Sequence, residues 1–296
     1  MKGFIAAALA AVPMLQAADL PRPVQLALTY DEEVGCLGAP PLIAAMSGLP
    51  KASAVIVGEP TEMTVVTGHK AIADLRTHVR GYEVHSSLMH KGVSAVMVAA
   101  KLIGWVSARE AETRAAAAGA PLGYDPPWTT LHVGMISGGT AHNITAGDCH
   151  FTLDIRALPT EAMEDWIARY RGFVQEVEAE IQAVHPDAAI TVSIGSHVPG
   201  CRPEEEGAAE ALARRLTGDN GTHVVSYAAE AGQFQDGGYS TVLCGPGSIA
   251  QAHQANEYIA RSELKAADRF MRRLAADLAA GSVCSKFLSH GRPVTR

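Results

Sequence analysis

Four side chains capable of metal binding or proton transfer stand just after short apolar runs of the sequence. They are Glu32, Glu33, Glu59 and His253. Carboxylate oxygens and imidazole nitrogens together suit a zinc ion in a hydrolytic site. Adjacent Glu32 and Glu33 point in different directions in an extended turn, so one can bind a metal while the other takes a proton from an attacking water. Each residue alone is better explained as a solvated turn or a cap, and only their joint placement favours a site.

The apolar runs that precede these residues are short and bounded by Gly and Pro, as in buried strands. They span residues 24–30, 53–57 and 240–244. Helical patterns lie between and after them, notably at 204–217 and 261–280. This alternation predicts an α/β fold with a mostly parallel sheet and helices. Ligands of such sheets bind at the carboxyl ends of the strands, where the four side chains are expected.

The middle of the chain has a different pattern. Residues 70–80 and 149–156 alternate between polar and apolar types, as half-exposed strands do. The expected order is strand, helix, strand, strand, helix, strand, at 70–80, 93–114, 129–137, 149–156, 160–184 and 189–194. This is the order of a ferredoxin-like α+β unit. We expect it at 70–199, inserted between the two parts of the α/β domain, 1–69 and 200–296.

Composition narrows the class of protein. The 296 residues are 48% hydrophobic and 19% charged, with a formal net charge of −7. Apolar content of this size supports a core, and the absence of a basic stripe argues against nucleic-acid binding. No apolar run has the length of a transmembrane helix, so no membrane partner is expected. The five cysteines are odd in number and form no CxxC pair, which favours free thiols in a reducing compartment and a cytoplasmic location.

Several segments together resemble the M20 family of di-zinc amidohydrolases and peptidases, and within it the acetylornithine deacetylase branch. They are TYDEEVGCLG (29–38), GEPT (58–61), GYEVHSS (81–87), ISGGTAHN (136–143), LDIR (153–156), EAGQF (230–234) and GPGSIAQAH (245–253). The resemblance implies zinc-dependent hydrolysis of N2-acetyl-L-ornithine to acetate and L-ornithine, in arginine biosynthesis. A desuccinylase acting on succinyl-diaminopimelate, an aminoacylase and a carboxypeptidase remain as alternatives with the same chemistry.

The resemblance also assigns roles to the four acidic and imidazole residues. Glu32 is the implied general base. Glu33 and His253 are the implied ligands of one zinc, and Glu59 of a second, giving two Zn²⁺ per subunit with Co²⁺ as a possible substitute. Asn256 stands where the family usually has Asp, which would weaken the support of His253.

Three residues of the inserted unit have implied roles as well. His85 would polarise the scissile carbonyl from the partner subunit, which implies a homodimer paired through this lid/dimerisation domain. Asn143 and Arg156 would hold the carboxylate of a small N-acyl amino acid substrate. Without the resemblance, His85 does not stand out from other histidines of the unit. The alternation of His78, His132 and His150 with apolar residues predicts strand positions, not ligands.

The N-terminus has two interpretations. Residues 1–18 combine a positive start, an apolar stretch and small residues, as a secretory signal does, but they also fit an Ala-rich buried helix. The resemblance favours the helix, because the family's bridging Asp typically lies directly before a Met-Lys-Gly sequence like that at Met1, and its His-x-Asp motif further upstream. We therefore expect the 296-residue chain to be a weak or inactive enzyme, with a non-catalytic dimerisation module as the alternative.

Overall fold

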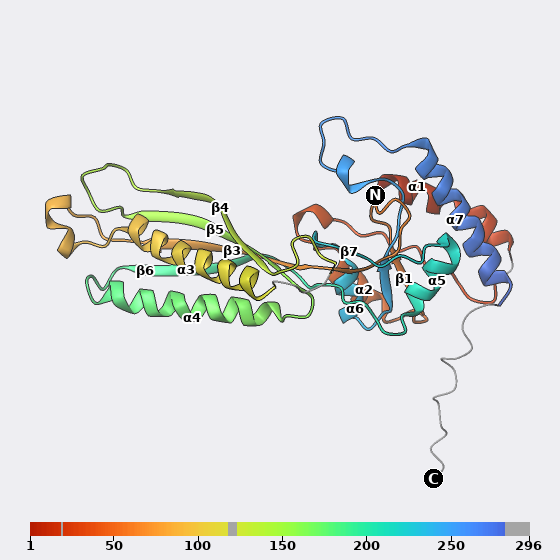
Figure 1. Ribbon diagram of the computed structural model, residues 1–296, viewed down its shortest axis with the longest axis horizontal. Helices are drawn as coiled ribbons and strands as arrows, with labels where there is room; N and C mark the ends of the chain where they lie inside the picture. Colours follow the sequence, from red (N-terminus) through yellow and green to blue (C-terminus); the bar gives the residue numbers. More distant parts are fainter. Residues whose placement is uncertain (19, 118–122, 282–296) are drawn as a thin grey trace, which may run out of the picture.

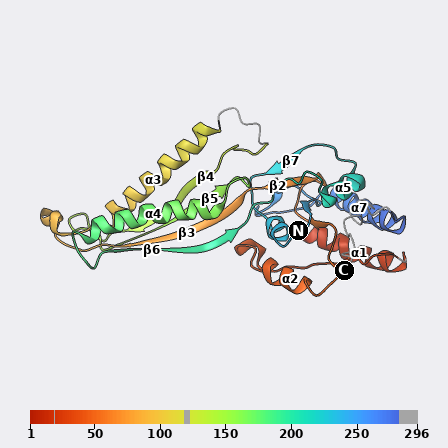
Figure 2. The ribbon, with the colours of Figure 1, turned by 90° about the horizontal axis from the view of Figure 1, so that it is seen from below.

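The computed structural model describes residues 1–18, 20–117 and 123–281, so Cys284 lies outside the described residues. Two four-stranded sheets lie side by side along the long axis (Figure 1). The strand order is β1-β8-β2-β7 in the first sheet and β4-β5-β3-β6 in the second. The second sheet and its helices extend away from the first as an elongated unit (Figure 2).

The first sheet is mixed but mainly parallel. Its strands are β1 (Val55–Val57), β2 (Val66–His69), β7 (His223–Val225) and β8 (Thr241–Leu243). β1 pairs with β8 and β2 with β7 in parallel, while β2 and β8 meet antiparallel at one register position, Val66 with Leu243. The α/β expectation is confirmed.

Helices bury both faces of this first sheet, as a parallel sheet requires. They are α1 (Lys2–Ala17), α2 (Ala39–Met46), α5 (Ala208–Thr217), α6 (Ala231–Asp236) and α7 (Arg261–Ala279). Leu243 of β8 packs in a cluster with residues of α2 and α6, whereas its neighbour Val242 packs with α5. The two faces of one strand thus contact different helices, and α7 packs against α1 and α5. α2 and α6 were not expected from the sequence, although Pro40 and Pro41 in the first turn of α2 are a helix-start signal.

The second sheet, which we call the lid sheet, is antiparallel throughout. Its strands are β3 (Ala71–Arg80), β4 (Thr130–Gly138), β5 (Asp148–Ala157) and β6 (Ala189–Val198). The helices α3 (Ala95–Ala116) and α4 (Met163–Gln182) cover one face (Figure 1). Burial alternates along β3, with its odd-numbered residues packed in the core. The predicted ferredoxin-like order is present, and the even-numbered residues of β3 occupy the face opposite to the helices, the open face.

One predicted strand is wrong. Residues 24–30 form no strand, and Leu26, Leu28 and Tyr30 are exposed. An apolar run this short cannot be distinguished from a loop by periodicity alone. In the described part of the chain it has no neighbouring strand to supply ladder hydrogen bonds, so it connects α1 to the loop that carries Glu32.

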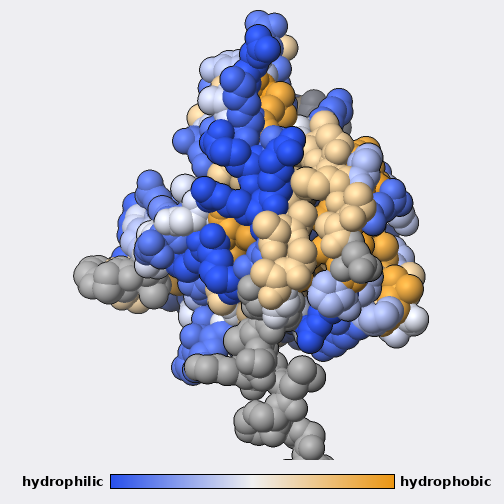
Figure 3. All heavy atoms as spheres, turned by 90° about the vertical axis from the view of Figure 1, so that its right-hand side faces the viewer, coloured by the Kyte–Doolittle hydropathy of each residue, from blue (hydrophilic) through white to orange (hydrophobic). Residues whose placement is uncertain are grey.

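The N-terminal helix α1 has an apolar outer surface. Ala8 and Ala11 are buried against the α7 side, whereas Ile5 and Leu9 are exposed. Figure 3 shows the side of the molecule that carries α1, α5 and α7, where apolar atoms lie next to a hydrophilic strip. None of the described helices has the length and hydropathy needed to cross a bilayer.

Candidate active site

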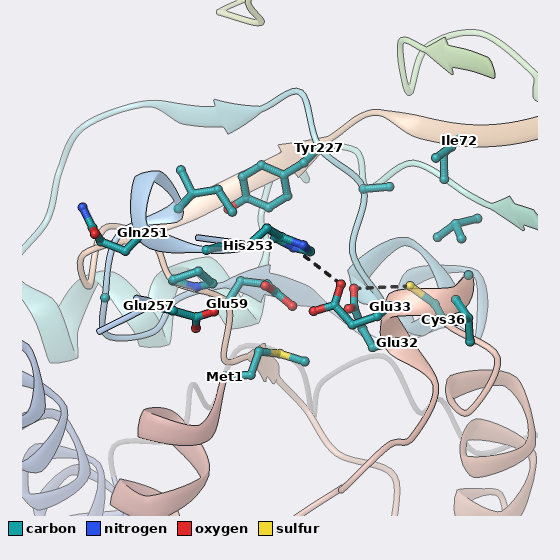
Figure 4. A pocket seen from close by; sticks show the side chains of 18 of the residues that line it. Met1, Glu32, Glu33, Cys36, Glu59, Ile72, Tyr227, Gln251, His253 and Glu257 are labelled. Atoms are coloured by element: carbon teal, nitrogen blue, oxygen red, sulfur yellow. Dashed lines mark hydrogen bonds and ion pairs between the residues drawn. The ribbon is translucent and has the colours of Figure 1, made fainter. Parts of the chain in front are cut away.

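A cavity of about 1060 Å³ lies where the lid sheet meets the first sheet. Its walls include the four residues expected at the strand ends, Glu32, Glu33, Glu59 and His253, together with Arg156 of β5. Figure 4 shows the three carboxylates pointing toward one another, with the imidazole of His253 beside them. Five of the seven expected site residues therefore line one cavity.

The loop that carries Glu32 and Glu33 is held in an unusual backbone conformation. The two residues open a short 3₁₀ turn, η1 (Glu32–Val34), between Asp31 at φ 54° and Gly35 at φ 110°. A Cβ on Gly38 would lie 2.3 Å from the backbone oxygen of Tyr30, so only glycine fits where the loop closes on itself. A non-glycine residue at positive φ costs energy, and such residues cluster at functional sites. The motif therefore specifies a tight loop that presents two adjacent carboxylates.

Glu59 is placed by the parallel pairing of β1 and β8. Because both strands end at the same edge, the turn after β1 meets the turn after β8. The N–H of Thr61 donates to the backbone oxygen of Gly245 at 3.1 Å, and the N–H of Gly245 donates to Oγ1 of Thr61 at 3.1 Å. Glu59 is buried within this junction, and its Oε1 has no hydrogen-bond partner among the described residues.

His253 reaches the same space from the segment after β8. It follows the short turn η3 (Ile249–Gln251) and has a positive φ of 60°. Its Nε2 lies 3.5 Å from Oε2 of Glu33. The two loops at opposite sides of the cavity thus meet through an imidazole and a carboxylate.

Burial and mutual repulsion shift the titration of these carboxyl groups. Burial, followed by the charge of Glu32, raises the pKa of Glu59 to about 7. Burial and the neighbouring Glu33 raise the pKa of Glu32. Burial and the nearby Glu59 also raise the pKa of the Tyr227 hydroxyl. A cation is the natural partner for carboxylates gathered in this way.

Glu230 is a buried acidic residue behind this site to which the sequence assigned no role. Its Oε2 accepts a hydrogen bond from Oγ1 of Thr29 at 2.9 Å, while its Oε1 has no partner among the described residues. Gln233, one turn further along α6, donates from Nε2 to the backbone oxygen of Cys36 at 3.2 Å. α6 therefore holds the Glu32 loop at both ends. The EAGQF segment (230–234) pointed to this position in the sequence, but a sequence motif does not show which residues Glu230 and Gln233 contact.

The donor set fits a divalent cation. Carboxylate oxygens and one imidazole converge, and the buried Oε1 of Glu59 lacks a partner that a cation would provide. Within the described residues, the ligand atoms of this cavity do not form a set of three within 4.8 Å of one another. An ion held here by three ligand atoms of the protein therefore requires side chains of the cavity to move closer together.

The expected lid residues fall into two groups. Arg156 lines the cavity, where its Nε contacts both carboxylate oxygens of Asp154 at 3.1 and 3.2 Å. His85 and Asn143 lie together at the other end of the lid, where the N–H of Ser86 donates to the backbone oxygen of Asn143 at 2.8 Å. β3 joins the two ends over 10 residues, about 30 Å at roughly 3.3 Å per residue. One chain therefore does not bring His85 and Asn143 to its own cavity.

The fold and the site are those of a hydrolase that uses a divalent metal. The family model for peptidase family M20/M25/M40 matches residues 1–277. The chain belongs to this family, which confirms the resemblance carried by its motifs.

Similar proteins agree with this assignment. The chain is 32% identical to an acetylornithine deacetylase of Myxococcus xanthus, over 95% of this chain and 71% of the relative. It is 30% identical to an acetylornithine deacetylase of Salmonella arizonae, over 88% of this chain and 65% of that relative.

Solved structures show the same fold. The aminopeptidase PepT of Bacillus cereus superimposes with a TM-score of 0.69 at 22% identity, over 94% of this chain and 70% of that one. An M20 family metallo-carboxypeptidase of Sulfolobus solfataricus has a TM-score of 0.69 at 17% identity, over 94% of this chain and 76% of that one.

Proposed function

We propose that the chain hydrolyses the amide bond of a small N-acyl amino acid, with N2-acetyl-L-ornithine as the first candidate, to give acetate and L-ornithine. The observation that carries the proposal is the convergence of Glu32, Glu33, Glu59 and His253 in one cavity. The relatives named acetylornithine deacetylase, at about 30% identity, support the substrate. This activity would place the chain in arginine biosynthesis. Free buried cysteines, four of which are described, agree with a cytoplasmic location.

The residues that would hold metal are Glu33 and His253 at one position and Glu59 at a second. Zinc is our candidate, two ions per subunit, with Co²⁺ as a substitute, because mixed carboxylate and imidazole ligands suit these metals. When bound, such an ion polarises a carbonyl and makes water a stronger nucleophile at neutral pH.

Glu32 is the group we assign to proton transfer. Glu32 is adjacent to Glu33 in the sequence, but the two carboxylates contact different residues. Oε1 of Glu32 lies 3.7 Å from Sγ of Cys36, whereas Glu33 contacts His253. It would accept the proton of the attacking water and deliver it to the leaving amine. A raised pKa suits both steps, because a general base acts best when its pKa approaches the working pH.

Arg156 is the group we assign to the substrate carboxylate. Its contacts with Asp154 use Nε, so the two terminal nitrogens can bind a carboxylate in the bidentate manner. Arg76, on the neighbouring strand, lines the same cavity. Each arginine of this wall is paired with an aspartate of its own strand, Arg76 with Asp74 and Arg156 with Asp154, so the lid supplies guanidinium groups to the cavity without a net positive charge.

A homodimer would complete the site. We propose that residues 70–199 form a lid and dimerisation domain, attached to a catalytic domain made of 1–69 and 200–296. In the dimer, His85 and Asn143 of one lid would reach the cavity of the other subunit. Their position at the far end of the lid, away from their own cavity, supports this arrangement.

A second candidate is a non-catalytic dimerisation module. It is favoured by one observation: among the described residues lining the cavity, His253 is the only histidine. Metal binding distinguishes the two functions. Tight zinc binding by the purified chain, together with acetate release, supports the enzyme. Dimerisation with neither of these supports the module.

The proposed reaction is tested by incubating the purified chain with Zn²⁺ or Co²⁺ and N2-acetyl-L-ornithine and measuring the free amine that hydrolysis releases, with acetate as a second readout for acetylated substrates. N-succinyl-diaminopimelate, other N-acetyl amino acids and dipeptides form the comparison panel. We expect acetylornithine to have the highest kcat/KM. Faster turnover of the succinyl substrate would overturn the substrate assignment, and no turnover of any member would overturn the hydrolase.

A further inference from the structure

A second group of metal-ligand side chains lies on the open face of the lid sheet. It consists of His78 on β3 and Asp148 and His150 on β5. The ligand atoms of all three lie within 4.8 Å of one another, and in the described part of the chain no other group of three does so. The group lies on the lid, apart from the cavity that holds Glu33, Glu59 and His253.

The backbone alone brings these three side chains together. His78 and His150 are directly opposite in the antiparallel pairing of β3 and β5. Directly opposite residues share a face, with Cβ atoms roughly 5 Å apart. Asp148 lies two residues before His150 and so shares that face as well. The register of the two central strands of the lid thus fixes an Asp-x-His pair beside a third ligand.

The side chains already contact one another. Nε2 of His78 lies 2.7 Å from Oδ1 of Asp148. The rings of His78 and His150 stack with centroids 4.1 Å apart and planes within 7°.

The surroundings leave room for an ion. A cavity of about 880 Å³ on the open face is lined by His78 and His150 together with Ser137 of β4 and Thr191 of β6. These two hydroxyl residues are paired in register with His150 and His78, so one polar row crosses all four strands. Arg80, opposite Asp148, donates from Nε to the backbone oxygen of Asp187, which gives its guanidinium a partner outside the group.

The distance between ligand atoms around a metal ion shows which side chains must move when the ion binds. Two ligand atoms at about 2.0–2.1 Å from a tetrahedral ion lie roughly 3.3 Å apart. The pair of His78 and Asp148 is already closer than this, while the His150 ring must turn out of the stack to face the same point. Asp148 and His150 are exposed, where such rotation is easy, and His78 is half-buried.

We propose that His78, Asp148 and His150 form a binding site for a divalent transition metal of the zinc class on the lid sheet. Two imidazoles and a carboxylate are the donors such ions prefer, and three protein ligands leave one position open. The ion would join β3 to β5, the two central strands of the lid. The inference does not depend on the proposed function, because none of its ligands lines the candidate active site.

The experiment measures Zn²⁺ alone, by titration calorimetry and by metal content after gel filtration. It compares the wild-type chain with His150→Gln and Asp148→Asn on the lid, and with His253→Gln in the cavity. The control is His132→Gln, since His132 lies on β4 of the same sheet outside the group. We expect one zinc equivalent to be lost, or weakened by roughly tenfold or more, in both lid variants. That equivalent should persist in His253→Gln and His132→Gln.

The proposal is overturned if His150→Gln and Asp148→Asn bind as much zinc as the wild type with the same affinity. Because the altered side chains lie on the surface, thermal unfolding should show that all variants fold. Loss of zinc only in His253→Gln would assign all bound metal to the cavity and would also overturn it. Acetylornithine turnover is a separate readout, so failure of the proposed reaction leaves this result interpretable.

Discussion

The imidazole of His253 and the carboxylate of Glu33 lie 3.5 Å apart, Nε2 to Oε2, although their loops are distant in the sequence. Both side chains are about 71% exposed, so an ion pair here adds little stability. His253 nevertheless takes up a positive φ, which is unfavourable for a non-glycine residue. A pair that contributes little stability but is held in a costly conformation is better explained by a ligand than by folding.

We therefore expect His253→Gln to lower Zn²⁺ affinity by roughly tenfold or more while changing the free energy of unfolding of the metal-free chain by less than about 0.5 kcal/mol. Zinc titration and urea unfolding in the presence of chelator measure the two effects. The matched control is His197→Gln, which removes another surface histidine–glutamate pair, with Glu164 at 3.4 Å. Equal zinc affinity in both variants would contradict the assignment of His253.

Glu32→Gln separates proton transfer from metal binding. The amide is nearly isosteric with the carboxyl but cannot accept a proton. We expect kcat for acetylornithine to fall by roughly 10²–10⁴-fold, with zinc content and KM little changed. Glu33→Gln should behave differently and lose zinc. If Glu32→Gln lost zinc while Glu33→Gln kept it, the two adjacent roles would have to be exchanged.

Glu59→Gln tests whether the buried carboxylate lacks a partner when no cation is bound. The pKa of Glu59 is raised to about 7 from an ordinary 4.5, so its contribution to stability is full below pH 4.5 and is lost as the pH rises through 7. In the metal-free chain, the variant should therefore be more stable than the wild type at pH 8, by up to about 3 kcal/mol, and equal to it at pH 4.

Urea unfolding with chelator at the two pH values measures this difference. Added zinc should reverse it, because an ion that binds only the folded wild type stabilises that state. A wild-type chain that stays more stable than Glu59→Gln at pH 8 without metal would show that Glu59 has a partner within the protein.

Most elements of the lid could be predicted from the sequence, whereas part of the catalytic region could not. β3 and β5 show clear period-two alternation because one face is buried and the other open. Residues 24–30 have the composition of a strand but, within the part of the chain that the structure describes, no strand beside them, and neighbours are not visible in a local pattern. The short strands β2 and β7 were not predicted from the sequence for the same reason.

Some residues of the candidate site could be predicted from the sequence, and others could not. Glu32, Glu33, Glu59 and His253 could be anticipated because each follows an apolar run near one sheet edge. Glu230 could not be given a role, since its importance lies in a contact with Thr29 across the fold. The sequence predicts strand positions for His78 and His150, which is confirmed, and it also predicts that they are not ligands. Our proposal departs from that second prediction, because only the register of β3 with β5 shows that the two rings stack beside Asp148.

Mixing two variants tests the proposed dimer. His85→Ala and Glu32→Gln should each be inactive alone, but a mixed dimer would contain one intact site, with Glu32 from one subunit and His85 from the other. Random exchange makes half of the dimers mixed and restores one of their two sites, so about a quarter of wild-type activity should return. Asn143→Ala should complement Glu32→Gln in the same way. No recovery in a mixture shown by sedimentation to be dimeric would contradict the shared site.

The last prediction concerns His69, a fully buried histidine where β2 passes into the lid strand β3. Its Nδ1 lies 2.9 Å from the backbone oxygen of Lys70, and its Nε2 accepts a hydrogen bond from the N–H of Gly232 in α6 at 3.1 Å. Burial lowers the pKa of His69 to about 4 from 6.5, so the unfolded chain binds the extra proton between these values. The stability that neutral His69 contributes is complete above pH 6.5 and is lost as the pH falls toward 4, by about 3 kcal/mol.

The stability contributed by Glu59 changes with pH in the opposite direction in part of this range. The quantity to measure is therefore the difference in the free energy of unfolding between wild type and His69→Gln. That difference, from urea unfolding at pH 4, 5, 6.5 and 8, should be largest at pH 8 and shrink steadily toward pH 4. A difference in the free energy of unfolding that does not depend on pH would mean that His69 does not have to stay neutral in the folded chain to accept the hydrogen bond from Gly232 of α6.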